Sequence, residues 1–100
     1  MKVEISQKDN QVLVAVEGRV DTLTSSDFEK QLSPYFSMQG VELVLDCAAM
    51  EYISSAGLRV VLMAHKNISA RAGRFAIRHL NSEVRSVFDM TGFSRILTIE

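Results

Sequence analysis

Polar and apolar residues alternate at the start of the chain, where Val3 and Ile5 stand between polar neighbours. A polar turn covers residues 8–11, and an unbroken apolar run then extends from Val12 to Val16. Alternation with a period of two is typical of a half-buried strand, whereas a continuous apolar run indicates a strand covered on both faces. We therefore expect an antiparallel hairpin with its tip at residues 9–10 and with its second strand covered on both sides.

Helical spacing replaces the alternation after Gly18. The apolar positions that repeat every four residues are Phe28, Leu32 and Phe36. Residues 24–27 are Thr-Ser-Ser-Asp, which supplies several capping side chains and an acid for the first turn. Pro34 cannot donate a backbone hydrogen bond, so the predicted helix is interrupted near Ser33.

The stretch from residue 41 to residue 62 contains a strand, two serines and the start of a helix. The strand contains the apolar residues Val41, Leu43, Val44 and Leu45, followed by small residues at 46–49 and the apolar pair 52–53. Ser54 and Ser55 come next, and the apolar residues then take helical spacing: Leu58, Val61, Leu62 and Ile68. The two hydroxyls therefore lie at the N-terminus of a helix that we expect over about residues 55–72.

The remaining elements are shorter. Gly73 closes the predicted helix, and residues 74–78 form a strand with two apolar residues on one face. Asn81 or Ser82 caps a third helix, which ends near Gly92. Apolar residues at 96–99 predict a last short strand.

This order of elements, β-β-α-β-α-β-α-β, predicts a single α/β domain over residues 1–100. We expect one mixed sheet with an N-terminal hairpin, right-handed crossovers, and helices packed mainly on one face. The C-terminal ends of strands and the N-terminal ends of helices then share one edge, where sites in such sheets usually lie. Asp21 and the serine pair 54–55 both fall at that edge.

Composition excludes several classes of function. The net charge of −1 gives no general attraction to nucleic acid, and the arginines are spread along the chain. No window approaches the roughly 20 apolar residues of a membrane span, and the N-terminus has no signal-peptide pattern. Cys47 is the only cysteine, which favours a reducing compartment. We expect a cytoplasmic protein without a membrane span and without a nucleic-acid partner.

Catalytic and cofactor motifs are not found in the sequence. The serines have no Gly-x-Ser-x-Gly elbow, and no glycine-rich phosphate loop ends in Lys-Ser or Lys-Thr. One cysteine and two distant histidines do not have metal-ligand spacing. We therefore expect no enzyme activity, no metal and no cofactor.

A serine at a helix N-terminus has two interpretations. The unpaired backbone N–H groups there favour a capping hydroxyl, which is a structural role. The same helix end also tolerates a phosphate group, because the dipole favours negative charge. Spacing alone does not separate these interpretations, and Asp21 similarly remains either a plain turn residue or a part of the same site.

Several segments together resemble the STAS domain, the family of bacterial anti-sigma-factor antagonists. The most specific is Ile53-Ser-Ser-Ala-Gly-Leu-Arg-Val60 after the strand at 43–46, and further segments agree in order at 18–21, 73–75 and 84–93. In antagonists of this family the regulatory serine lies two residues before the glycine of the motif. The resemblance therefore implies that Ser55 is phosphorylated, and it places Asp21 beside it. Ser54 stands where the best-studied members often have aspartate.

The resemblance also implies a function and partners. The unphosphorylated protein is expected to bind an anti-sigma factor that is also its serine kinase, and so to release a sigma factor. Phosphorylation ends that binding, and a phosphoserine phosphatase restores it. The residues expected at the partner interface are Asp21, Ser54, Ala56, Gly57, Arg59 and Met63. Met63 among polar residues is either an incidental exposed side chain or the adaptable centre of a docking surface.

An alternative keeps the fold and changes the function. A STAS module can also be a scaffold or a regulatory subunit of a lipid-transport or sensory complex, with no phosphorylation cycle. The replacement of the common aspartate by Ser54 gives this alternative its weight.

Overall fold

Six strands form a mixed sheet around the long strand β2 in the computed structural model, which describes residues 1–100. The strand order is β1-β2-β3-β5-β6, and β4 also pairs with β2. Only β1 and β2 are antiparallel, and the other pairings are parallel. The strands are β1 (Lys2–Lys8), β2 (Gln11–Val20), β3 (Glu42–Asp46), β4 (Met50–Ile53), β5 (Arg74–Arg78) and β6 (Thr98–Ile99). The predicted fold class, an α/β domain with a mixed sheet and an N-terminal hairpin, is confirmed.

Strand β4 has no counterpart among the elements predicted from the sequence. It pairs with the last residues of β2, beyond the part of β2 that pairs with β3. The register of the β2–β4 pair shifts between Gly18 and Arg19, and Gly18 has a positive φ of 90° that favours glycine. The chain therefore leaves β3, crosses residues 47–49, and rejoins the sheet against the far end of β2.

The helices follow the predicted positions closely. They are α1 (Ser25–Leu32), α2 (Ser55–Ala70) and α3 (Ser82–Met90), with short 3₁₀ segments η1 (Ser33–Tyr35) and η2 (Phe93–Arg95). Helix α1 ends where the proline predicted an interruption, and its chain continues as the 3₁₀ turn that contains Pro34. Asn81 caps α3 by accepting the backbone N–H of Val84 at 2.8 Å. The glycine after this helix, Gly92, has a φ of 81°.

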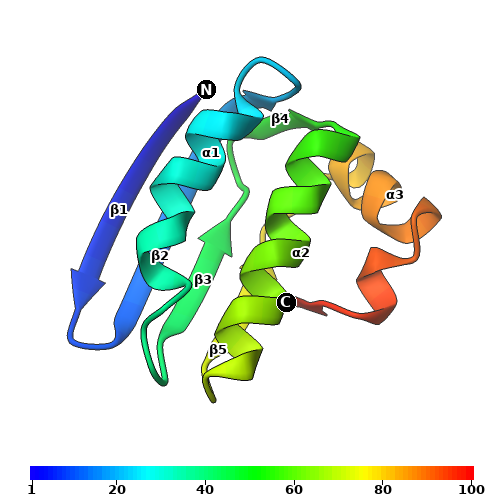
Figure 1. The fold of residues 1–100 in the computed structure, drawn as a ribbon. Helices are drawn as coiled ribbons and strands as arrows, with labels where there is room; N and C mark the ends of the chain where they lie inside the picture. Colours follow the sequence, from blue (N-terminus) through cyan, green and yellow to red (C-terminus); the bar gives the residue numbers. More distant parts are fainter.

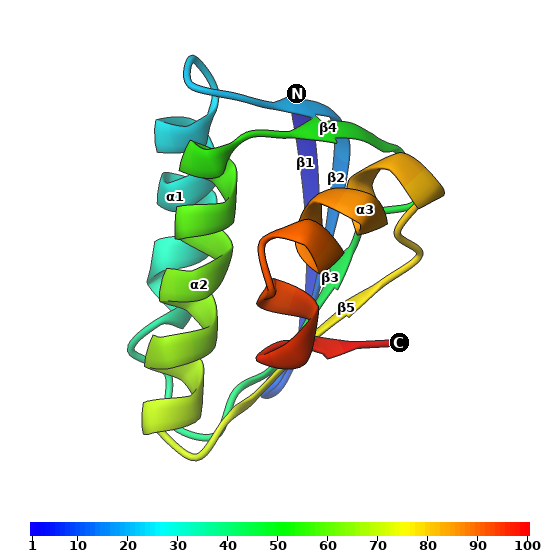
Figure 2. The ribbon, with the colours of Figure 1, turned by 90° about the vertical axis from the view of Figure 1, so that its right-hand side faces the viewer.

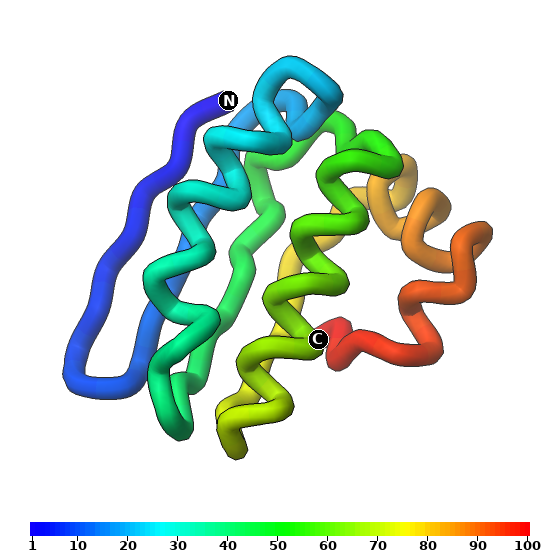
Figure 3. The backbone as a smooth tube through the Cα atoms, viewed as in Figure 1, coloured from blue at the N-terminus to red at the C-terminus, as the bar shows by residue number.

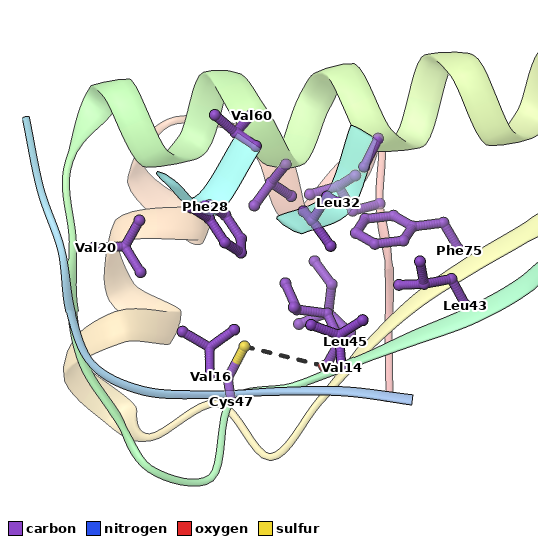
Figure 4. Packing of buried hydrophobic residues seen from close by; sticks show 14 of the residues in the cluster. Val14, Val16, Val20, Phe28, Leu32, Leu43, Leu45, Cys47, Val60 and Phe75 are labelled. Carbon is purple, nitrogen blue, oxygen red and sulfur yellow. Dashed lines mark hydrogen bonds between the residues drawn. The ribbon is translucent and has the colours of Figure 1, made fainter. Parts of the chain in front are cut away.

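Helices α1 and α2 lie side by side on one face of the sheet (Figures 1 and 2). The core between the helices and the strands contains fully buried side chains from both layers, and Figure 4 shows Phe28 and Leu32 of α1 directed toward Val14 and Leu45 of the sheet. These are the positions at which helical spacing and strand alternation meet. The prediction that helices pack mainly on one face is therefore confirmed.

The opposite face of β2 corrects one expectation. Val12, Val14 and Val16 are buried in the core, but Leu13 and Ala15 between them are only half-buried. The expectation that this strand is covered on both faces is wrong, because α1 and α2 both pack on the side of the valines, where Figure 4 shows Phe28 of α1 and Val60 of α2. None of the helices combines the length and the apolar character that a membrane-spanning helix needs.

Truncation of Phe28 should strongly destabilise the domain, because its ring is 0% exposed between α1 and the sheet. We expect Phe28→Ala to lower the free energy of unfolding by about 3–5 kcal/mol, measured by urea denaturation. Leu23→Ala is the matched control, since Leu23 is 87% exposed and its truncation should change stability little. Equal losses for the two variants would contradict this arrangement of the core.

Candidate functional site

The ends of β2 and β4 bring two distant segments together. Val20 and Ile53 are paired in parallel register, and the next residue of each strand begins a loop. The backbone N–H of Ser54 donates to the carbonyl oxygen of Val20 at 2.8 Å. Figure 3 shows the turn after β2 and the start of α2 at the same end of the molecule. The prediction that the segments near Asp21 and Ser55 meet at one edge of the sheet is confirmed.

The two adjacent serines have different surroundings. Ser54 is the N-cap of α2: its extended backbone has φ −90° and ψ 174°, and its Oγ accepts the N–H of Gly57 at 3.3 Å. Its carbonyl oxygen accepts the N–H of Leu58 at 2.9 Å. Ser55 is the first helical residue, its side chain is exposed, and its hydroxyl forms no hydrogen bond in the structure. The structural role that sequence left open therefore belongs to Ser54, and the hydroxyl of Ser55 is free.

Gly57 allows the first turn of α2 to lie directly against the sheet. A Cβ atom on Gly57 would lie 2.8 Å from side-chain carbons of both Val20 and Ile53, and 3.3 Å from the carbonyl oxygen of Val20. Any larger residue would push the helix away from the two strand ends. Gly57 is itself buried, so it lies beneath the expected partner interface and not on its surface. It affects that interface by positioning the start of α2.

Asp21 organises the loop between β2 and α1. Its Oδ1 accepts the backbone N–H groups of Leu23 at 2.9 Å and Thr24 at 3.1 Å. The hydroxyl of Thr24 accepts the N–H of Asp21 at 2.9 Å and donates to the carbonyl oxygen of Arg19 at 3.0 Å. The pKa of Asp21 lies below its ordinary value, and the largest cause is the hydrogen bond from the Leu23 amide. Desolvation is the second largest influence and raises the pKa, whereas the Thr24 hydrogen bonds and the charge of Arg19 lower it further.

Thr24 is a functional candidate that sequence reasoning treated only as a helix cap. Its side chain makes no capping bond to α1, and instead it closes the Asp21 turn. The spacing Asp-x-x-Thr contains this signal, because each side chain can reach the other residue's backbone. Thr24 therefore fixes the direction in which the Asp21 carboxylate points.

Two apolar side chains are exposed near this edge. Leu23, at the tip of the loop, is 87% exposed, and Tyr52 on β4 is 39% exposed. The guanidinium carbon of Arg19 lies 4.3 Å from the centre of the Tyr52 ring, which is cation–π geometry. The exposure of Leu23 cannot be predicted from a single sequence, because leucine is equally common in a core.

Arg59 and Met63 lie one turn apart on the outer side of α2. Arg59 is exposed and approaches Glu29 of α1, with 3.7 Å between its Nη2 and the Glu29 carboxylate. Its Nη1 also lies 3.7 Å from the Met63 sulfur. Met63 and Ala56 are half-buried. We refer to the surface formed by Asp21, Leu23, Ser55, Arg59 and Met63 as the switch edge.

Other reactive side chains lie away from the switch edge or inside the core. Burial raises the pKa of the Cys47 thiol to about 12, with a contribution from the Asp46 charge, so the thiol stays protonated and unreactive. Nδ1 of His79 lies 3.1 Å from a carboxylate oxygen of Asp46, at the end of β5. No three His, Cys, Asp or Glu side chains are grouped to hold a metal ion.

Comparison with known proteins assigns the chain to a family. Residues 2–100 match the STAS domain family. The chain belongs to this family. It is 31% identical over 99 residues to BtrV of Bordetella bronchiseptica, which carries the name of an anti-sigma factor antagonist; the match covers 99% of this chain and 85% of BtrV. The resemblance of the serine motif and its flanking segments is therefore confirmed at the level of the family.

A second relative is also named an anti-sigma factor antagonist, and a solved structure has the same fold. The anti-sigma-B factor antagonist of Bacillus subtilis is 25% identical over 99 residues, which are 99% of this chain and 90% of that protein. The Bacillus protein SpoIIAA in its phosphorylated form has the same fold, with a TM-score of 0.77 and 17% identity over 99% of this chain and 91% of that one. This STAS domain is thus related to anti-sigma factor antagonists along its whole length, and these relatives are regulatory proteins.

Replacement of Gly57 should displace the start of α2. We expect Gly57→Ala to destabilise the domain by about 1–3 kcal/mol, although alanine is the better helix former, because the added methyl group has no space beside Val20 and Ile53. Ser55→Ala, two residues earlier and exposed, is the matched control and should leave the unfolding midpoint unchanged. A Gly57→Ala variant as stable as the wild type would show that the helix start is free to move.

The Asp21 turn should respond to acid in a defined direction. Because folding lowers the pKa of Asp21, its carboxylate stabilises the native state above the ordinary pKa of 3.8, and that contribution is lost as the pH falls through the lower native value. We expect an NMR titration of the Asp21 carboxyl carbon to give a midpoint below 3.8. In Asp21→Asn the amide oxygen can keep the turn without this titration. A midpoint at or above the ordinary value in the native protein would contradict the hydrogen bonds described.

Proposed function

We propose that this STAS domain is an anti-sigma factor antagonist whose binding to an anti-sigma factor is controlled by phosphorylation of Ser55. The observation that carries the proposal is the difference between the two serines: the Ser54 hydroxyl caps α2, whereas the Ser55 hydroxyl is exposed and free of hydrogen bonds. A kinase can therefore reach Ser55 without breaking a bond that holds the fold. The names of the relatives support the class of function, and the phosphorylated form of SpoIIAA supports the modification.

The helix N-terminus suits a phosphoserine at this position. The phosphate carries about −1.5 to −2 charges at pH 7, and the positive end of the α2 dipole stabilises negative charge by about 0.3–1 kcal/mol. Ser54 keeps its capping bond to Gly57 when Ser55 is modified, because the Ser55 hydroxyl takes no part in that bond. The modified domain should therefore remain folded, and the effect of the phosphate falls on recognition.

The partner would dock on the switch edge in the unphosphorylated state. Leu23 offers an exposed apolar contact beside Asp21, and Met63 offers an adaptable apolar contact beside Arg59. A phosphate on Ser55 adds bulk and charge between these contacts. Binding is lost because the partner surface would have to accommodate a desolvated dianion next to an ionised Asp21.

The remaining partners follow from this cycle. The anti-sigma factor would itself be the serine kinase and would hold the ATP, so this chain needs no cofactor. A phosphoserine phosphatase would restore the free hydroxyl and the bound state. Ser54, Ala56 and Gly57 support the interface mainly through the position of α2, and the cycle would operate in the cytoplasm.

Variants of the serine pair test the proposal. Immobilised wild type, Ser55→Ala and Ser55→Asp should be compared as baits in an extract of the native cell. We expect the wild type and Ser55→Ala to retain an anti-sigma factor kinase, and Ser55→Asp to lose it while its melting temperature stays close to that of the wild type. Ser54→Ala is the matched control: it should still bind and be phosphorylated, with a loss of about 0.5–2 kcal/mol of stability from the missing cap.

The site of modification is decided by mapping the phosphate. The retained kinase, given ATP, should phosphorylate the wild type and Ser54→Ala but not Ser55→Ala, as read by mass spectrometry. Phosphate on Ser54 instead would move the switch by one residue. Phosphate on neither serine, with partner binding intact, would contradict the switch and favour a scaffold in a lipid-transport or sensory complex.

A further inference from the structure

The face of the sheet opposite α1 and α2 carries an open groove. The groove has a volume of about 480 Å³ and is lined by residues of β1, β2, β3 and β5, with Glu100 at its end. Leu13, Val44 and Ala76 are in register across three neighbouring strands and form an apolar row along its floor, in which Leu13 and Val44 are half-buried and Ala76 is buried. We refer to this surface as the open face. Leu13, Val44 and Ala76 alternate along their strands with residues that face the core under α1 and α2. The open face therefore lies on the other side of the sheet and is separate from the switch edge.

Charges on the open face are sorted by strand. Strand β3 presents Glu42 and Asp46 on either side of Val44. Strand β5 presents Arg74 and Arg78 on either side of an alanine, at the same registers: Glu42 pairs with Arg74, and Asp46 pairs with Arg78. An acidic strand therefore lies beside a basic strand, with an apolar residue at the centre of each.

Ion pairs within one copy leave one of these charged side chains without a partner. Arg78 Nε lies 3.5 Å from Asp46, and Arg74 lies 3.5 Å from the carboxylate of Glu100. Glu42 forms no ion pair and has only a long contact of 3.5 Å with the side-chain amide of Gln11. Only Glu42 lacks an ion-pair partner, so a surface that covers the open face must offer it a cation, with apolar groups beside it. Both arginines of β5 are already paired, and an anion above them would join an existing ion pair.

The open face of a second copy of this chain is such a surface. Consider a two-fold axis parallel to the strands and midway between β3 and β5, with two sheets packed face to face. Each β3 then lies over the β5 of the other copy, so that Glu42 faces Arg74, Val44 faces Ala76, and Asp46 faces Arg78. This is aligned sheet packing with a self-complementary interface, as two-fold symmetry requires. A second copy is favoured over an extended peptide because it matches all three rows at once.

We propose that the open face is a homodimer interface in which β3 of each copy lies on β5 of the other. The ion pair of Asp46 and Arg78 stays intact when it is covered, so no unpaired charge is buried there. Both switch edges remain on the outside of the dimer, since α1 and α2 point away from the interface. The dimer would thus display two independent docking sites.

Charge reversal tests this geometry directly. In Glu42→Arg each Arg74 would face an arginine, and in Arg74→Glu each Glu42 would face a glutamate. We expect the full chain to dimerise in sedimentation equilibrium and each single variant to have a dissociation constant raised at least about tenfold. An equimolar mixture of the two variants should recover dimers, because one copy then presents only arginine at these positions and the other only glutamate. The matched control is Lys66→Glu on α2, which should dimerise like the wild type.

Three outcomes would overturn the proposal. A wild type that stays monomeric at every accessible concentration would leave the open face for a different protein. Dimers that neither reversal weakens would place the interface elsewhere. Failure of the mixture to recover dimers, with both variants folded by circular dichroism, would rule out β3 lying on β5. None of these outcomes bears on Ser55, so the test is separate from the proposed switch.

Discussion

The close contact between the first turn of α2 and the ends of β2 and β4 governs the arrangement of the whole switch edge. It depends on the absence of a side chain at Gly57, since a Cβ there would overlap both Val20 and Ile53. The hydrogen bond from the Ser54 amide to Val20 then joins the helix start to the strand that carries Asp21. Packing and hydrogen bonding at this point together convert two segments more than thirty residues apart into one surface.

Much of the fold can be predicted from local patterns. The four-residue spacing of Phe28 and Leu32 predicts α1, and Pro34 predicts its interruption, because both effects act within one or two turns. The meeting of Asp21 and Ser55 can also be predicted, since parallel strands place equivalent ends at one edge. These features require knowledge only of periodicity and of the handedness of crossovers.

Other features depend on contacts that a local pattern does not contain. Strand β4 forms because β2 extends past β3 and offers free backbone groups there, and its own residues show no clear alternation. The run from Val12 to Val16 is apolar at every position, yet only one side is covered, because α1 and α2 both pack on the side of the valines and α3 packs against β4 instead. The division of roles between Ser54 and Ser55 likewise depends on φ and ψ at the helix start, which the pair of identical residues cannot reveal.

The free hydroxyl of Ser55 has a consequence for the amount of protein in the cell. Degradation of a small domain follows the population of its unfolded state, and that population depends on the free energy of unfolding. Because Ser54 and not Ser55 caps α2, modification of Ser55 leaves the interactions that set this free energy in place. Under the proposed cycle, the phosphorylated form would then be degraded no faster than the unphosphorylated form, and a brief signal would alter the output without depleting the regulator.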